Sequence, residues 1–285
     1  MNMPPQSTPP QPPKSPGDRR TRSRFDSMKV WDEASGALLA NREVLMAVMG
    51  VFAVLPVFAL AQFLPLPEPV QGQLPAQLLE RWAQYFDANW LPYLAALLVE
   101  MFGMLVALAL LGDPARPTVG EAMRQAARSA PAFIAALIAA HAVALLAGLV
   151  PVTMIGLIGS LLLTQVAAIL GTVFILYMMV RFGFIGPVVV LGGTRNPLEA
   201  LRRSFMATKG IGWQLLVFLL LIYFAFAIVG WLLTSAFAIV ATLLAGAEGG
   251  HLVGNLIASL VQGAQAATFV AVIAASYRQL GEPAH

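Results

Sequence analysis

Long runs of apolar residues, separated by short polar segments, occupy most of the chain after residue 44. A helix needs about 20 apolar residues to cross the hydrocarbon core of a bilayer. Six runs reach that length with few or no charges, and they extend over residues 44–64, 90–111, 131–150, 157–180, 213–245 and 252–277. This pattern predicts an all-α fold, a polytopic membrane protein with six transmembrane helices.

Three of the polar segments share a second pattern, a Glu-Ala pair near the start of a short amphipathic helix. The pairs begin at Glu33, Glu121 and Glu199, and an apolar run follows each helix. Apolar residues recur at helical spacing on one face of each segment, while arginines occupy the other faces of the second and third. Such helices lie in the headgroup region of a membrane. The chain therefore predicts three repeats of an amphipathic interfacial helix plus two spans.

The two ends of the chain differ from this pattern. Residues 1–24 are rich in proline, serine and arginine and contain almost nothing to bury, which predicts a disordered cytoplasmic tail. Residues 25–280 then form the six-helix membrane domain, and residues 281–285 form a short cytoplasmic tail.

Composition agrees with a membrane environment. Hydrophobic residues make up 59% of the chain and charged residues 11%, whereas soluble domains have roughly 45–50% apolar and about 25% charged residues. The absence of cysteine excludes disulfides, thiolate metal sites and cysteine nucleophiles. The basic residues are not gathered on a soluble domain, so we expect no nucleic-acid partner.

The positive charges orient the predicted spans. All but one of the 17 lysines and arginines fall in alternate segments, and Arg81 is the exception. Lysine and arginine collect on the cytoplasmic side of short loops. We therefore expect both termini in the cytoplasm and the protein in a bacterial inner membrane.

The basic residues on the interfacial helices are candidates for a lipid or partner surface. Near an anionic leaflet each is worth about 1 kcal/mol of attraction. The alternative is that they are ordinary positive-inside loops that happen to be helical, and the sequence leaves both interpretations open. The candidates are Arg124, Arg128, Arg202, Arg203 and Lys209.

Glu100 is the one charged residue inside a predicted span. Burying a charge there costs about 2.5–3.5 kcal/mol even on lenient insertion scales, so an intramembrane acid is a functional candidate. The competing interpretation is a neutral glutamate that holds helices together, bonded to a backbone carbonyl or to Gln165.

Further polar residues lie inside the last and the third spans. Those of the last span share one helical face, a pattern more typical of packing between helices than of a pathway. His141 stands alone in the third span and is expected to be a bonded core residue. We expect no metal site. The residues of the last span are His251, Asn255, Ser259, Gln262 and Gln265.

The stretch from Arg181 to Leu221 resembles the membrane-domain family associated with glycerophosphoryl diester phosphodiesterases and its YciC-like relatives. Gly192 stands where relatives often have a glutamate. Some relatives carry a soluble phosphodiesterase barrel, and these 285 residues include none, so the resemblance implies a membrane architecture without that activity. The positions that match are Arg181, Ala200, Leu201, Ser204, Thr208, Lys209 and Gly210.

These patterns lead to two expectations of function. The first is a non-enzymatic membrane protein without a cofactor, which engages membrane lipids, above all anionic headgroups, or a membrane-protein partner such as a second copy. The alternative is a small-solute or lipid transporter with a midplane polar site around Glu100. An intramembrane enzyme would need a nucleophile with its base, or a metal, and the sequence offers neither. A cavity around Glu100 would favour transport, and a closed apolar bundle would favour the first expectation.

Overall fold

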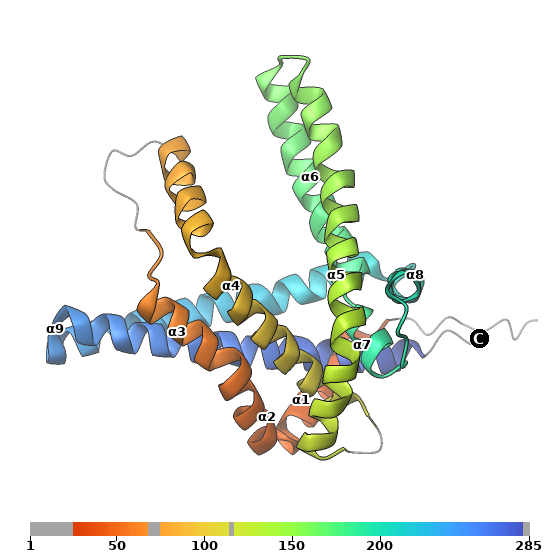
Figure 1. The fold of residues 1–285 in the computed structure, drawn as a ribbon, viewed down its shortest axis with the longest axis horizontal. Helices are drawn as coiled ribbons and strands as arrows, with labels where there is room; N and C mark the ends of the chain where they lie inside the picture. The colour runs from red at the N-terminus through yellow and green to blue at the C-terminus, as the bar shows by residue number, and fades with distance from the viewer. Residues whose placement is uncertain (1–24, 68–74, 114–116, 282–285) are drawn as a thin grey trace, which may run out of the picture.

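The structure is a computed structural model, and it describes residues 25–67, 75–113 and 117–281. Within these ranges the protein consists of helices joined by short turns and loops and has no strand, which confirms the expected all-α class (Figure 1). The helices long and apolar enough to cross a membrane are Arg42–Phe63, Ala76–Gly112, Val119–Gly156, Leu161–Val190 and Gly212–Leu280. These helices suit a multi-pass, membrane-embedded protein.

The chain first forms a short helix and then a first spanning stretch. The short helix α1 (Ser27–Ala40) begins where the Asp26 carboxylate accepts hydrogen bonds from the backbone of Met28 and Lys29. The spanning stretch consists of α2 (Arg42–Met49), the π-helical turn η1 (Gly50–Val54) and α3 (Leu55–Phe63). Pro56 lies in the first turn of α3. Proline lacks a backbone N–H, so it cannot donate a helical hydrogen bond. The π turn before it changes the spacing of the backbone hydrogen bonds at this point.

Helix α4 (Pro75–Gly112) begins well before the predicted span at residue 90 and bends at Asn89, where φ is −121° and ψ is 16°. Pro92 follows within the helix. The proline ring clashes with the backbone carbonyl one turn earlier, and proline cannot donate the helical hydrogen bond to it. This accounts for the bend. The predicted span is thus the second part of a longer, kinked helix.

Helices α5 (Val119–Gly156) and α6 (Leu161–Arg181) form a hairpin. A capping box between Thr118 and Glu121 starts α5. The second amphipathic segment then continues into its span without a break, because α5 runs through Pro131 and ends only at Gly156. The predicted start of the next span at residue 157 falls in the turn, and α6 begins at residue 161 after the Ser160 cap.

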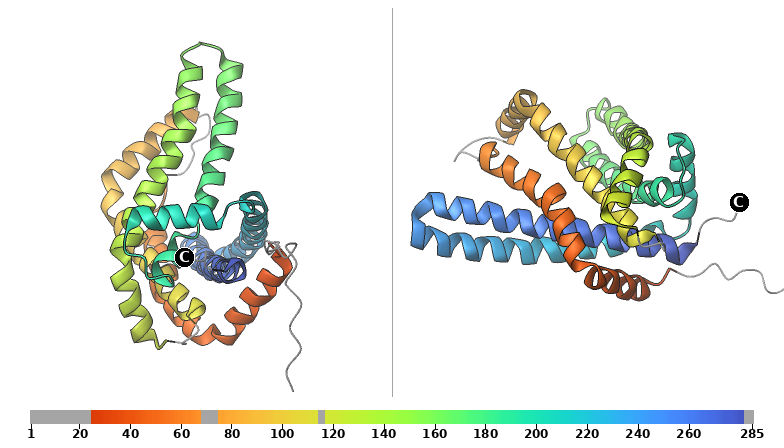
Figure 2. Two further views of the ribbon diagram at one scale, coloured as in Figure 1. Left: turned by 90° about the vertical axis from the view of Figure 1, so that its right-hand side faces the viewer. Right: turned by 60° about the horizontal axis from the view of Figure 1, so that its bottom comes forward.

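The third amphipathic segment is preceded by α7 (Ile185–Val190) and forms α8 (Pro197–Ala207), capped by Asn196. The last helix, α9 (Gly212–Leu280), contains one non-helical residue, Gly246, at φ 76°. L side chains rarely adopt this conformation, and the chain reverses there. The halves on either side of Gly246 correspond to the fifth and sixth predicted spans and pack against each other, as Gly230 against Val261 shows (Figure 2).

The hairpins diverge from a common base (Figures 1 and 2). At this base, Arg278 near the end of α9 pairs with Glu33 of α1 at 2.7 Å and donates to the Leu111 carbonyl of α4 at 2.6 Å. The Gln279 side chain accepts from the Asp26 backbone. Segments predicted to lie in the cytoplasm therefore gather at one end of the molecule.

The opposite ends of two hairpins carry exposed apolar side chains. Leu157, in the α5–α6 turn, is 81% exposed, and Leu244, near the bend of α9, is 83% exposed. Large exposed apolar surfaces are unusual on soluble monomers and mark contact with lipid or with another protein. A membrane environment accounts for these surfaces.

Candidate functional site

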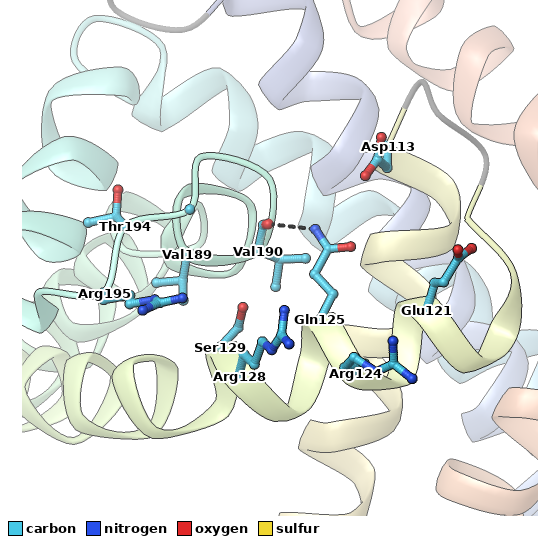
Figure 3. A pocket seen from close by; sticks show the side chains of 11 residues that line it. Asp113, Glu121, Arg124, Gln125, Arg128, Ser129, Val189, Val190, Thr194 and Arg195 are labelled. Atoms are coloured by element: carbon cyan, nitrogen blue, oxygen red, sulfur yellow. Dashed lines mark hydrogen bonds between the residues drawn. The ribbon is translucent and has the colours of Figure 1, made fainter.

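A pocket of ≈ 450 Å³ lies between the first turns of α5 and the loop that joins α7 to α8 (Figure 3). We name it the basic pocket, because three arginines from two elements take part in its wall. Its lining residues are Asp113, Glu121, Arg124, Gln125, Arg128, Ser129, Val189, Val190, Gly193, Thr194 and Arg195.

The two walls of the basic pocket are fixed to each other. The Gln125 side chain of α5 donates a hydrogen bond to the Val190 carbonyl of α7 at 2.9 Å (Figure 3). Ala122 and Ala126 of α5 are fully buried. Gly193 has φ 62°, which lets the chain turn sharply after α7 and leads directly to Thr194 and Arg195. The pocket is therefore built on packed elements.

The arginines give the pocket an excess of positive charge. Arg124 and Arg128 are four residues apart on α5 and share a face, and Arg195 comes from the loop. Arg124 interacts with the charge of Glu121, whose carboxylate is already bonded to Thr118. Among the described residues, neither Arg128 nor Arg195 forms an ion pair. These two guanidinium groups remain available to an anion.

Two hydroxyl groups lie in the same pocket. Thr194 is 8% exposed, and its Oγ1 is buried without a hydrogen-bond partner. Ser129 is 9% exposed. A buried hydroxyl without a partner costs about 1–3 kcal/mol. The guanidinium donors of the pocket suit an oxyanion, and phosphate in particular.

The other predicted basic residues lie outside the basic pocket. Arg202 and Lys209 are exposed, the first on α8 and the second just after it. Arg203 pairs with Glu199 one turn away, at 2.6 Å. The structure thus separates Arg124 and Arg128, which line a pocket, from the basic residues of α8.

Three residues of the family resemblance, Arg181, Ser204 and Thr208, form a buried hydrogen-bond network. The Ser204 hydroxyl donates to the Arg181 carbonyl at 3.0 Å and accepts from the Phe184 backbone at 3.1 Å. Thr208 also donates to the Arg181 carbonyl, at 3.1 Å. The Arg181 guanidinium donates to the Phe205 carbonyl at 2.7 Å and lies over its ring. The network joins the end of α6 to α8, so its role is structural.

A second cavity, of ≈ 600 Å³, lies between α3, α4 and the second half of α9. We name it the polar cavity, since Glu100 lies in its wall. Its lining residues are Val57, Leu60, Ala61, Leu64, Pro65, Leu66, Tyr93, Ala96, Leu97, Glu100, His251, Asn255 and Gln262.

Three of the five predicted polar residues of the last span reach this cavity. Gln262 lies close enough to the Glu100 carboxylate for their side chains to interact. Asn255 donates to the Ala61 carbonyl of α3 at 3.2 Å, and His251 also lines the cavity. Ser259 is buried and donates to the carbonyl of Asn255 within its own helix, at 2.7 Å. The stripe therefore contributes both to packing and to a cavity.

The remaining polar candidates lie elsewhere. Gln165 is exposed on α6 and does not line the polar cavity. His141 is exposed on α5, with its Nδ1 2.8 Å from the Leu137 carbonyl. Gln265 is half-buried on α9. Among the described residues no group of three histidine or acidic side chains could hold a metal ion.

Arg195 and Thr194 are functional candidates that the sequence did not single out. In the sequence, Arg195 is one of the positive charges that orient the predicted spans. The available clue was the run Gly-Gly-Thr-Arg-Asn directly after an apolar segment, which predicts a turn that presents polar side chains.

Comparisons with known proteins add no further assignment. No family model matches the chain, and no curated protein or solved structure matches it. The resemblance over Arg181–Leu221 therefore stays a prediction.

Proposed function

We propose that this protein is a non-enzymatic inner-membrane protein whose basic pocket binds the phosphate of a membrane lipid headgroup. The observation that carries the proposal is the position of Arg128 and Arg195. They come from different elements to one pocket and form no ion pair in the described part of the chain.

The proposal includes a topology of six spans with both termini in the cytoplasm. Dividing α9 at Gly246 supports six spans, because each half is longer than the roughly 20 residues that a bilayer requires. The three amphipathic segments become α1, the start of α5, and α8, each followed by two spans. The gathering of positively charged segments at one end supports a cytoplasmic base.

A lipid headgroup fits the position of the pocket. The pocket adjoins the start of α5, where an amphipathic segment leads straight into a span. With the topology proposed above, such a junction would lie at the level of the headgroup phosphates of the cytoplasmic leaflet. The cavity volume of ≈ 450 Å³ is within the usual range for small-molecule sites.

Arg195→Gln is expected to weaken the binding of phosphatidylglycerol about fivefold, since one basic residue near the headgroups contributes about 1 kcal/mol. The purified protein would be titrated with this lipid in a neutral detergent, with the thermal unfolding midpoint as the readout. The effect should shrink at high salt, where screening already removes attraction.

The matched control is Arg202→Gln, because Arg202 is an arginine on the neighbouring α8 outside the basic pocket. It should bind the lipid like the unmodified protein. If the two variants lost lipid affinity equally, the lipid would be responding to overall charge. The proposal that the basic pocket binds the headgroup would then be wrong.

Transport is a second candidate function, and the polar cavity is the specific observation that favours it. Glu100 lies in the wall of a cavity of ≈ 600 Å³. Intramembrane acids that line cavities mark substrate and ion pathways.

A further inference from the structure

We propose that the polar cavity is a binding site for an organic ammonium ion with an apolar body, and that the ammonium group binds Glu100. The proposal rests on the second candidate function, transport, because it names the ligand of the same cavity. Binding can be measured without any flux, so the two proposals can fail separately.

The charge of the cavity wall selects a cation. Among its described lining residues Glu100 is the one acidic side chain, and none is lysine or arginine. An ammonium group near this carboxylate is attracted by its opposite charge. An anion would be repelled by the same carboxylate. The charge of the cavity wall is thus opposite in sign to that of the basic pocket.

The polar groups of the cavity form a path along α9 to this carboxylate. His251, Asn255 and Gln262 lie on one face of the helix and all line the cavity. At 1.5 Å per residue, the distance from His251 to Gln262 is roughly 16 Å along the axis. Each offers an oxygen or nitrogen atom to a passing ammonium group.

The contacts of Glu100 leave it able to bind a ligand. Gln262 is the side chain that interacts with Glu100 among the described residues, and an ionised carboxylate offers about four acceptor positions. Acceptor positions of the carboxylate therefore remain for the N–H groups of a primary ammonium ion.

The other walls of the cavity are hydrocarbon. Val57 and Leu60 from α3 and Leu97 from α4 line it together with the polar groups. A ligand that filled the cavity would therefore have an apolar body beside its charge. The volume of ≈ 600 Å³ suits a small organic molecule. A bare divalent ion is a poor fit, because hard cations require several oxygen ligands.

The test uses three probes that share one hydrocarbon chain: hexylammonium, 1-hexanol and hexanoate. They would be titrated by calorimetry into the full chain in a neutral detergent. Hexylammonium should bind saturably. The neutral and anionic probes should have affinities at least about tenfold lower, because they lack the attraction to Glu100. Equal affinity for hexanol and hexylammonium would overturn the proposal.

Glu100→Gln should reduce the affinity for hexylammonium about tenfold or more, since it removes the charge and keeps the shape. The matched control is Glu248→Gln, which removes an exposed carboxylate of α9 outside the cavity and should leave the affinity unchanged. Unchanged affinity in a Glu100→Gln chain with a normal unfolding midpoint would refute the site.

A second variant covers the case in which Glu100→Gln fails to fold. Ala96 is one turn before Glu100 and lines the cavity, so Ala96→Phe narrows the cavity and keeps the carboxylate. This variant should also lose most hexylammonium binding. Full binding in folded Ala96→Phe would contradict a ligand seated in the cavity.

The ammonium group could belong to a free amine or to the headgroup of phosphatidylethanolamine. Adding phosphatidylethanolamine to the titration distinguishes the sources. Competition with hexylammonium would identify the lipid headgroup, while unaltered binding would identify a free amine. Both outcomes support recognition of ammonium, and neither depends on the Arg195 titration of the basic pocket.

Discussion

Ser204→Ala is expected to lower the free energy of unfolding by about 1–3 kcal/mol. The Ser204 hydroxyl is fully buried, and it bonds both the Arg181 carbonyl and the Phe184 N–H. Thr208 still donates to the Arg181 carbonyl in the variant, but the Phe184 N–H loses its partner in a site closed to water. A buried backbone group without a partner is among the costly defects in a fold.

Thermal or denaturant unfolding in one fixed detergent would measure the loss. Ser35→Ala is the control, since the Ser35 hydroxyl donates to the Asp32 carbonyl on the exposed side of α1, where water can replace it. It should change stability by no more than about 0.5 kcal/mol. If Ser204→Ala unfolded at the same midpoint as Ser35→Ala, the network joining α6 to α8 would not stabilise the protein.

Gly171→Ala is expected to destabilise the α5–α6 hairpin by about 1–3 kcal/mol, the usual range for overpacking. A Cβ atom at Gly171 would lie 2.9 Å from the backbone oxygen of Gly148 on α5 and 2.9 Å from a methyl group of Val152. Backbone cannot move aside as a flexible side chain can. The two helices would therefore have to separate, and close approach through small residues is what holds such helices together.

Gly36→Ala provides a control of opposite sign. A Cβ atom at Gly36 meets nothing within 4 Å, and the residue lies inside α1. Alanine at such a helical position is more stable than glycine by roughly 0.5–1 kcal/mol. A higher unfolding midpoint for Gly36→Ala and a lower one for Gly171→Ala would show that the contacts at each position, and not the type of substitution, determine the change in stability. A stabilised Gly171→Ala would contradict the close packing of the hairpin.

The hydrophobic pattern was sufficient to predict where the long helices lie but not where they begin and end. Apolar runs locate the long helices because their composition is set by the solvent around them. They do not reveal that α5 continues through Pro131, since a proline in a long helix is tolerated when packing compensates for it. Nor do they show whether a reversal at a single residue, Gly246, separates two helices or leaves one continuous element.

The candidate sites could be predicted only in part, because each is completed by residues distant in sequence. Helical spacing identified Arg124 and Arg128, but their partner Arg195 comes from a loop whose path depends on packing. Glu100 was found because a charge in an apolar run is conspicuous. Its contact with Gln262 depends on how α4 packs on α9, which no local pattern encodes.

Native mass spectrometry of the protein released from lipid mixtures tests the central claim most directly. The comparison is Arg128→Gln with Arg195→Gln, inside the basic pocket, against Arg202→Gln with Arg203→Gln on α8. Each pair removes two positive charges near the same base. We predict that the first pair loses the tightly retained anionic phospholipid while the second pair keeps it. Retention of that lipid by the folded Arg128→Gln/Arg195→Gln protein would contradict the claim that the basic pocket binds lipid phosphate.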